Sequence, residues 1–144
     1  MRTGNVFISL YADPIHSGHV EYIALSKQLA NERGGKLIVC VNNDDQAVLK
    51  KGRPFMKCTE RLAIIRALRD VDIAFASIDT DRSVCASLRL AHSTWGVNVV
   101  GQGGDRSSGE VPEACVCHEL GIEMVDGLGD KIQSSSALTG LRAI

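Results

Sequence analysis

The stretch DPIHSGH, Asp13–His19, lies between a short apolar run and a segment whose apolar residues recur at helical spacing. The run before it is Asn5–Leu10 (NVFISL), which predicts a buried strand. The segment after it, from Gly18 to Glu32, predicts a helix that ends at Gly34-Gly35. A strand, a loop with two histidines and a helix therefore follow one another, and the rest of the fold is expected to form around this junction.

Strands and helices alternate along the remaining chain. The further predicted strands are Lys36–Val41, Val71–Ile78, Val97–Val100 and Ile122–Val125. The further predicted helices are Thr59–Asp70, Arg82–His92, a helix from Pro112 to Gly121, and Ser134–Ile144. Such alternation predicts parallel pairing with right-handed crossovers, so we expect one Rossmann-like, three-layer α/β domain over residues 1–144, with a parallel sheet of about five strands.

Composition limits the classes of function. The chain has 144 residues, enough for one stable domain, and its net charge of −1 argues against a protein that binds nucleic acid through phosphate attraction. Its five cysteines show no framework spacing, which predicts free thiols in a reducing compartment. Cys115-x-Cys117-His118 does not predict zinc, because no second ligand pair stands at finger spacing. We find neither a signal-peptide pattern nor a membrane-length apolar run, and expect a soluble, cytoplasmic protein that contacts no membrane.

The histidine junction has the properties of a phosphate site. Gly18 allows close approach of a ligand to the backbone, and the start of a helix favours an anion. His16 and His19 can donate hydrogen bonds to phosphate oxygens as charge develops on them. The alternative is two ordinary loop histidines, which the strand before them and the helix after them make less favourable.

Other segments are expected to reach the same site. Ligands on parallel sheets bind beyond the carboxyl ends of the strands, where the loops Asp13–His19, Asn42–Asp45 and Gly101–Asp105 should meet. Lys50–Pro54 is predicted to be a basic loop, with a merely solvated loop as the alternative. Ser134–Ser136 precede the last predicted helix, and a plain helix cap is the alternative there.

The stretch Asp13–His19 resembles the signature of the cytidylyltransferase-like nucleotidyltransferases. This family includes glycerol-3-phosphate cytidylyltransferase, the nucleotidyltransferase domain of ADP-heptose synthase, and nicotinamide mononucleotide adenylyltransferase. Further segments resemble the heptose enzyme in the same order along the chain. They are Val41–Asp44, Lys51–Pro54 with Glu60-Arg61, Ala67–Asp72, Gly103–Asp105 and Ser134–Ser136. This collinear agreement is more specific than any single motif.

The resemblance implies a reaction and a set of roles. A nucleotidyl group would pass from a nucleoside triphosphate to a small phosphorylated acceptor without a covalent intermediate, and pyrophosphate would leave. His16 and His19 would be catalytic, and Lys51, or its neighbour Lys50, would neutralise phosphate charge. Asp13 would help to hold Mg²⁺ through water. The residues implied to bind the nucleotide are Asp13, Gly18, Lys50, Arg53, Gly104, Asp105, Ser134, Ser135 and Ser136.

The base and the acceptor stay open. The segments similar to the heptose enzyme favour ATP and a phosphorylated sugar or polyol, and CTP with a glycerol-3-phosphate-type acceptor is the alternative. Tyr11-Ala12 stands where the family usually has a small residue and Phe, and Gln102 replaces a frequent Lys. The resemblance also implies a homodimer. A nucleotide-binding module without catalysis is disfavoured by the intact histidines, and a flavodoxin-like or receiver-type domain would leave them unexplained.

Overall fold

The computed structural model describes residues 4–103, 111–129 and residue 139. One sheet runs through this part of the chain in the strand order β3-β2-β1-β4-β5, and every pairing is parallel. The strands are β1 (Gly4–Leu10), β2 (Gly34–Val41), β3 (Ile73–Ala76), β4 (Val99–Gly101) and β5 (Glu123–Val125). The predicted parallel sheet of five strands is thereby confirmed.

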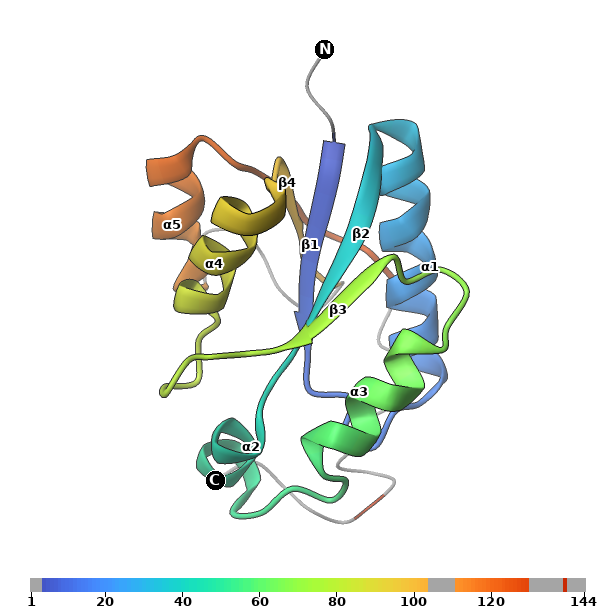
Figure 1. Ribbon diagram of the computed structural model, residues 1–144, viewed down its shortest axis with the longest axis vertical. Coiled ribbons are helices and arrows are strands. Elements are labelled where there is room, and N and C mark those ends of the chain that lie inside the picture. The colour runs from blue at the N-terminus through green and yellow to red at the C-terminus, as the bar shows by residue number, and fades with distance from the viewer. Residues whose placement is uncertain (1–3, 104–110, 130–138, 140–144) are drawn as a thin grey trace.

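Helices cover both faces of this sheet. The helices of the described part are α1 (Ser17–Glu32), α2 (Asp44–Lys51), α3 (Cys58–Arg66), α4 (Cys85–Trp95) and α5 (Glu113–Leu120). Figure 1 shows α1 and α3 on one side of the sheet and α4 and α5 on the other. The helix α2 lies instead beyond the carboxyl ends of the strands (Figure 1). The predicted three-layer architecture is confirmed, with α2 as an addition at the edge where ligands are expected.

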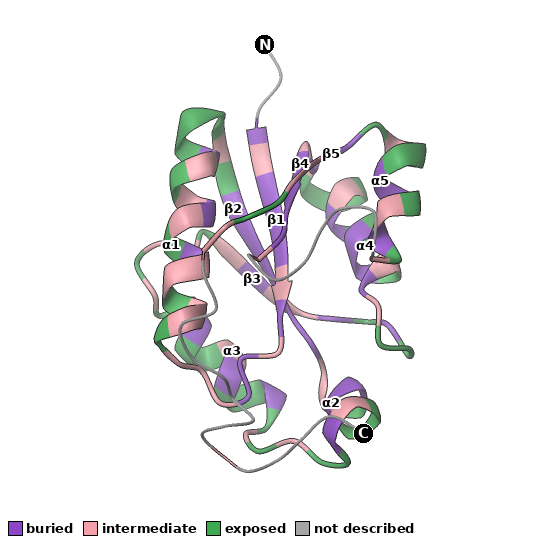
Figure 2. Ribbon diagram, turned by 180° about the vertical axis from the view of Figure 1, so that it is seen from behind, coloured by how far each residue is buried: buried purple, intermediate pink, exposed green. Residues whose placement is uncertain are grey.

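The side chains of β1 alternate between two hydrophobic cores. Val6, Ile8 and Leu10 belong to the core under α1 and α3, whereas Phe7 belongs to the core under α4 and α5. Burial on both faces explains why the central strands read as continuous apolar runs in the sequence. Figure 2 shows buried residues along β1 and β2 and on the inner sides of the helices.

The largest difference from the predicted elements is α2. The prediction of a basic loop over 50–54 is wrong for Lys50 and Lys51, which form the last turn of α2. This helix begins where the Asn43 side chain accepts a hydrogen bond from the main-chain N–H of Gln46, and it ends at Gly52 with φ of 88°. Only a glycine adopts that left-handed conformation without strain, so the loop proper starts there.

Other boundaries shift by less. The helix α3 ends at Arg66, before the predicted end at Asp70, and β3 is shorter than the predicted Val71–Ile78. The five cysteines are free thiols, as predicted. None of the described helices is long and apolar enough to cross a membrane. The predicted helix Ser134–Ile144 lies outside the described residues.

At β1 the order in which strands are added to the sheet reverses, with β2 and β3 on one side and β4 and β5 on the other. Phe7 lies opposite Ile38 of β2 on one side and opposite Val100 of β4 on the other. The chain first builds the sheet from β1 toward β3 and then crosses to β4, which makes the carboxyl end of β1 the topological switch point of the fold. The stretch Asp13–His19 leaves β1 at this point.

Candidate active site

His16 and His19 lie side by side at the start of α1. Their rings are stacked, with the centroids 3.8 Å apart. The Nδ1 atom of His16 accepts a hydrogen bond of 3.0 Å from the N–H of Gly18, and Nδ1 of His19 accepts one of 3.1 Å from the main-chain N–H of His16. His16 is also the N-cap residue of α1. Both rings are therefore fixed through Nδ1, and among the described residues none holds Nε2, which is the nitrogen that each ring can offer to a ligand.

The surroundings of this pair favour neutral rings. Burial and the charge of Lys51 lower the pKa of His16. Burial lowers the pKa of His19 to about 3, with further contributions from His16, Lys50 and Lys51. A neutral imidazole whose Nδ1 accepts a hydrogen bond carries its proton on Nε2. At neutral pH each histidine is thus a neutral Nε2–H donor, which suits contact with a phosphate oxygen.

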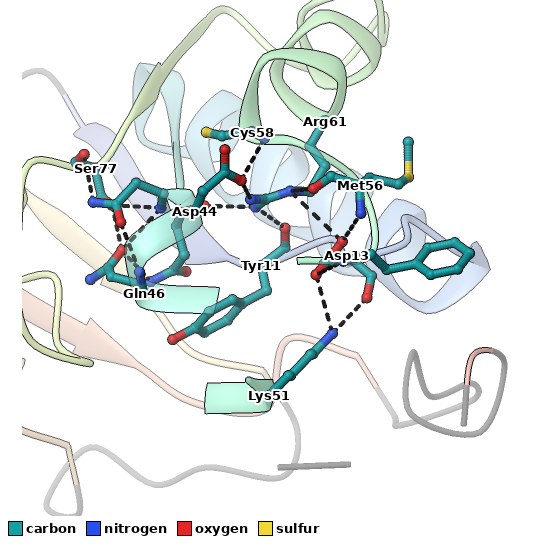
Figure 3. Close-up of polar contacts among 12 residues, drawn as sticks. Tyr11, Asp13, Asp44, Gln46, Lys51, Met56, Cys58, Arg61 and Ser77 are labelled. Atoms are coloured by element: carbon teal, nitrogen blue, oxygen red, sulfur yellow. Dashed lines mark hydrogen bonds and ion pairs between the residues drawn. The ribbon is translucent and has the colours of Figure 1, made fainter. Parts of the chain in front are cut away.

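Asp13 is a buried carboxylate just before the histidines. Its side chain is 0 % exposed. Oδ2 accepts a hydrogen bond of 2.9 Å from the N–H of Phe55, and Oδ1 accepts one of 2.5 Å from the N–H of Met56. Lys51 Nζ lies 3.7 Å from Oδ2, and Arg61 Nε lies 4.0 Å from Oδ1 (Figure 3). Asp13 therefore fastens the loop after α2 to the histidine junction.

This environment does not fit the predicted role of Asp13 as a holder of Mg²⁺. Protein-bound Mg²⁺ usually keeps several waters, whereas the Asp13 carboxylate is fully buried and both its oxygens accept main-chain hydrogen bonds. Within residues 4–103 and 111–129, no three His, Cys, Asp or Glu side chains come together as a metal site. We assign no step of the reaction to a metal held by Asp13.

Lys50 and Lys51 are adjacent in sequence but have different surroundings. Lys51 is buried, and its Nζ donates a hydrogen bond of 2.6 Å to the main-chain carbonyl of Asp13. Burial lowers the pKa of Lys51, and the charge of Asp13 opposes that shift. Lys50 is partly exposed, and its Nζ lies 4.1 Å from the centroid of the Tyr11 ring. One lysine is thus built into the packed base of the site, and the other lies nearer its surface.

Arg61 ties three parts of the site together from a fully buried position. Its Nη1 donates to the carbonyls of Tyr11 at 2.8 Å and Asn42 at 2.6 Å, at the ends of β1 and β2. Its Nε donates to the carbonyl of Met56 at 2.8 Å, and its Nη2 lies 3.0 Å from Asp44 Oδ1. Figure 3 shows these contacts converging on one guanidinium. Arg61 confirms that the loops after β1 and β2 meet at one edge of the sheet.

Gln46 performs a similar task for α2. Its side-chain amide is fully buried and takes part in a network between α2 and the loop that follows β3. Its Oε1 accepts from Asn42 Nδ2, the N–H of Asn43 and the hydroxyl of Ser77, and its Nε2 donates to the carbonyls of Asp81 and Ser83. These bonds hold α2 in place, and with it the two lysines of its last turn.

Sequence reasoning missed these roles of Arg61 and Gln46. Arg61 precedes the buried Ile65 by one helical turn, and this i, i+4 spacing is the signal that would have placed it on the inner face of α3. Gln46 follows Asn43 at the spacing of a capping box, and both reciprocal hydrogen bonds of that motif are present.

Comparison with known proteins decides the family. The model of the cytidylyltransferase-like family matches residues 11–103, which include the histidine pair and the residues that surround it. The chain belongs to the cytidylyltransferase-like family. The expectation drawn from the motif resemblance is therefore confirmed at the level of the family.

Relatives within this family include two bifunctional HldE proteins. The one from Streptomyces coelicolor is 33% identical over 116 residues, which are 78% of this chain and 23% of that protein. The one from Hydrogenovibrio crunogenus is 34% identical over 123 residues, or 83% of this chain and 23% of that protein. The chain thus spans less than a quarter of the length of these relatives.

A solved structure is similar over nearly its whole length. It is the lipopolysaccharide core biosynthesis protein from Thermoplasma volcanium, with a TM-score of 0.67 and 25% sequence identity. The match covers 88% of this chain and 98% of that protein chain. It confirms the Rossmann-like nucleotidyltransferase fold.

The other predicted nucleotide-binding residues of this cytidylyltransferase-like chain are placed as follows. Gly18 lies within the histidine junction, where its N–H is the donor to His16. Arg53 is exposed and follows the end of α2. Gly104, Asp105 and Ser134–Ser136 lie outside the described residues, so their predicted contacts with the triphosphate stay predictions.

Proposed function

We propose that the chain is a nucleotidyltransferase that moves a nucleoside monophosphate group from ATP to a phosphorylated sugar or polyol and releases pyrophosphate. One observation carries this proposal. The paired histidines are held neutral and fixed through Nδ1 at the N-terminal end of α1, beside the switch point of the sheet. Membership of the cytidylyltransferase-like family supports the reaction class.

The proposed reaction is a single in-line displacement. An oxygen of the acceptor's phosphate attacks the α-phosphorus of the nucleotide, and the bond from that phosphorus to the oxygen bridging the β-phosphate breaks. The pyrophosphate leaves with the electron pair of that bond. No proton has to be removed, because the attacking phosphate is already ionised. The Nε2–H groups of His16 and His19 donate to the phosphate oxygens on which charge shifts, and the N-terminal end of α1 adds partial positive charge.

The choice of nucleotide base and acceptor follows the heptose enzyme, which several segments of this chain resemble. The segments of this chain that resemble the heptose enzyme favour ATP and a sugar phosphate, and the HldE relatives support that preference. CTP with a polyol phosphate such as glycerol 3-phosphate is the second candidate. Mg²⁺ is part of the proposal as an ion that accompanies the triphosphate, and a cytoplasmic location is part of it as well.

A screen of pyrophosphate release tests this function. Each of the four nucleoside triphosphates is incubated with Mg²⁺ and a panel of sugar and polyol phosphates. We expect pyrophosphate only when both a nucleotide and a phosphorylated acceptor are present, with ATP ahead of CTP. Calorimetry that finds no affinity for any nucleotide would refute the proposal. Nucleotide binding without release for any acceptor in the panel would favour a binding module that has no catalytic activity.

A further inference from the structure

We propose that Ser9 and Gln102 bind the hydroxyl groups of the sugar or polyol acceptor, on the face of the sheet that α4 and α5 cover. The identity of this ligand as the acceptor rests on the proposed function. The site itself rests on two polar side chains in neighbouring positions at the carboxyl ends of β1 and β4, which the described part of the protein leaves without a hydrogen bond.

The register of the sheet brings these two side chains together. Phe7 of β1 lies opposite Val100 of β4, and both belong to the core under α4 and α5. Ser9 and Gln102 come two residues further along the chain from this pair, and side chains two residues apart share a face of a sheet. Gln102 directly follows β4, and its main-chain N–H still donates a hydrogen bond of 2.8 Å to the carbonyl of Val125 in β5. The register therefore places Ser9 beside Gln102 on this face.

The layer of helices leaves Ser9 open. Its neighbours on the same face, Phe7, Cys40 and Val100, are all buried. Ser9 is partly exposed, although β1 is the central strand and has a paired strand on either side. Partial exposure in the middle of a sheet means that the covering helices do not close over this point. A small ligand can therefore reach the Ser9 hydroxyl from the side of α4 and α5.

The protein itself uses neither polar group. No hydrogen bond from another described residue reaches the Ser9 hydroxyl or the Gln102 amide. Gln102 is only 7% exposed, yet within the described chain its amide atoms are not among those sealed from solvent without a partner. A largely buried amide without a hydrogen bond is unfavourable, so a ligand that supplies hydroxyl groups here gains both a donor and an acceptor.

The charges on this side of the sheet favour an uncharged part of the ligand. Asp79 and Glu113 are buried carboxylates that accept hydrogen bonds from N–H groups at the start of α4, and neither forms an ion pair with a described residue. Burial raises the pKa of Cys40, the neighbour of Ser9 in β2, and the charges of both carboxylates raise it further. A phosphate would be repelled at this point, whereas hydroxyl groups would not. The acceptor therefore has its phosphate at the histidine junction and its hydroxyl groups toward Ser9 and Gln102.

The residue type at position 102 supports the acceptor over the nucleotide. Gln102 stands where the heptose enzyme often has a lysine, so a neutral amide replaces a cation. The members of the family that this chain resembles share a nucleoside triphosphate and differ in their acceptors. A side chain that departs from the common pattern is therefore better suited to reading the acceptor than the ribose of the nucleotide.

The first measurement follows the side-chain amide resonances of Gln102 by NMR, identified by their disappearance in Gln102→Met. The probes are glycerol 3-phosphate, a hexose phosphate and a heptose phosphate. Ethyl phosphate is a control that carries the phosphate but no hydroxyl group, and a nonhydrolysable ATP analogue alone is a second control. We expect at least one hydroxyl-bearing phosphate to shift the Gln102 resonances, and neither control to shift them as far.

The second measurement compares Ser9→Ala and Gln102→Met with Gln28→Met, which alters an exposed glutamine of α1. Ser9→Ala and Gln102→Met should each weaken binding of the probe that shifts Gln102 by about 2- to 10-fold, as for one lost hydrogen bond, with unchanged affinity for the ATP analogue. The melting temperature should not fall in either variant, and it should rise in Gln102→Met, where an apolar group replaces a buried amide. A merely structural role would give the opposite result, a lower melting temperature at unchanged affinity.

The assignment to the acceptor is overturned if no hydroxyl-bearing phosphate shifts the Gln102 resonances, if a control shifts them as far, or if both variants bind the probe as well as Gln28→Met. A loss of affinity for the ATP analogue would overturn it too, by assigning the two side chains to the ribose of the nucleotide. None of these readouts requires nucleotidyl transfer, so a failed acceptor screen refutes the proposed function and leaves this binding site standing. An active enzyme whose Gln102 resonances stay unchanged with its acceptor would refute this inference alone.

Discussion

His16 combines two tasks in one ring, since Nδ1 caps α1 and Nε2 is left for a ligand. An alanine at this position would remove both, so loss of activity and loss of stability would be confounded. Asparagine separates them, because its side-chain oxygen can accept the capping hydrogen bond but cannot reach as far as Nε2. The same reasoning applies to His19, whose Nδ1 accepts from the backbone of His16.

We expect His16→Asn and His19→Asn each to lower turnover by about 10²–10³-fold, or about 2.7–4 kcal/mol, as for the loss of one donor to a developing anion. The melting temperature should stay close to that of the unaltered protein, whereas His16→Ala should lose about 1 kcal/mol of stability with the cap. The double variant should lose less than the sum, because both donors serve one phosphate group. Steady-state kinetics and thermal melts measure both effects, and near-normal turnover in the two Asn variants would exclude a catalytic role.

The lowered pKa of His19 predicts a pH dependence. Its value in the folded chain, about 3, lies below the ordinary 6.5, so between these values the unfolded chain binds the proton and the folded chain does not. The free energy of unfolding should therefore fall as the pH drops from about 6.5 toward 3. His19→Asn lacks this contribution and should gain stability relative to the unaltered protein on acidification. Melting curves of both at about pH 7.5 and about pH 4.5 test this; a constant difference would contradict it.

Among the secondary-structure elements, those with a regular pattern of apolar residues could be predicted from the sequence. The strands and the helices α1, α3, α4 and α5 bury aliphatic side chains at regular spacing, and their order was predictable. The helix α2 was not, because it exposes Val48 and Leu49 and buries Gln46. Polar contacts, not an apolar face, hold this helix. A hydropathy pattern likewise cannot predict that a charged side chain such as that of Arg61 is buried.

Arg61→Met should destabilise the fold by about 3–5 kcal/mol, since it leaves buried carbonyls without their donor and removes one of the two cations beside the Asp13 carboxylate. The loops after β1 and β2 should separate, and nucleotide affinity should fall with stability. Arg69→Met is the matched control because Arg69 is exposed, and it should stay within about 0.5 kcal/mol of the unaltered protein. Urea unfolding measures the difference, and equal midpoints for the two variants would show that Arg61 does not hold the loops together.

Gln46→Glu tests the polar attachment of α2. The new carboxylate oxygen would face the carbonyls of Asp81 and Ser83, which now accept hydrogen bonds from Nε2. We expect a loss of about 2 kcal/mol or more at neutral pH, with partial recovery in acid, where the protonated carboxyl can donate again. Gln28→Glu on the exposed side of α1 is the control. Unfolding curves that coincide for both variants at neutral pH would contradict this account.

For the whole molecule, the parallel sheet and the loops at one edge followed from the alternation of elements. The described site residues from Tyr11 to Arg61 gather beyond β1 and β2, as the topology predicts. What the sequence did not reveal is which residues connect the loops at this edge, because each connection is a single hydrogen bond between residues distant in the chain.

The family resemblance further predicts a homodimer. We expect light scattering at micromolar concentration to give twice the mass of one chain, 15.5 kDa, with little change over a tenfold dilution. The same measurement on Arg61→Met, below its melting temperature, would show whether dimer formation depends on the contacts that Arg61 makes with the loops of the site. A mass of one chain at every concentration would contradict the prediction.

The place of β1 between β2 and β4 also has a consequence for synthesis of the protein. Phe7 is made well before its partner Val100, because 92 residues separate them along the chain. Contacts so distant along a chain form slowly, and until β4 has emerged from the ribosome one side of β1 is an open edge. A nascent or truncated chain that stops after α4 would present this apolar edge to other chains, which promotes aggregation. The histidine junction, although it precedes β4 in the chain, is completed only when the fourth strand has been translated and paired.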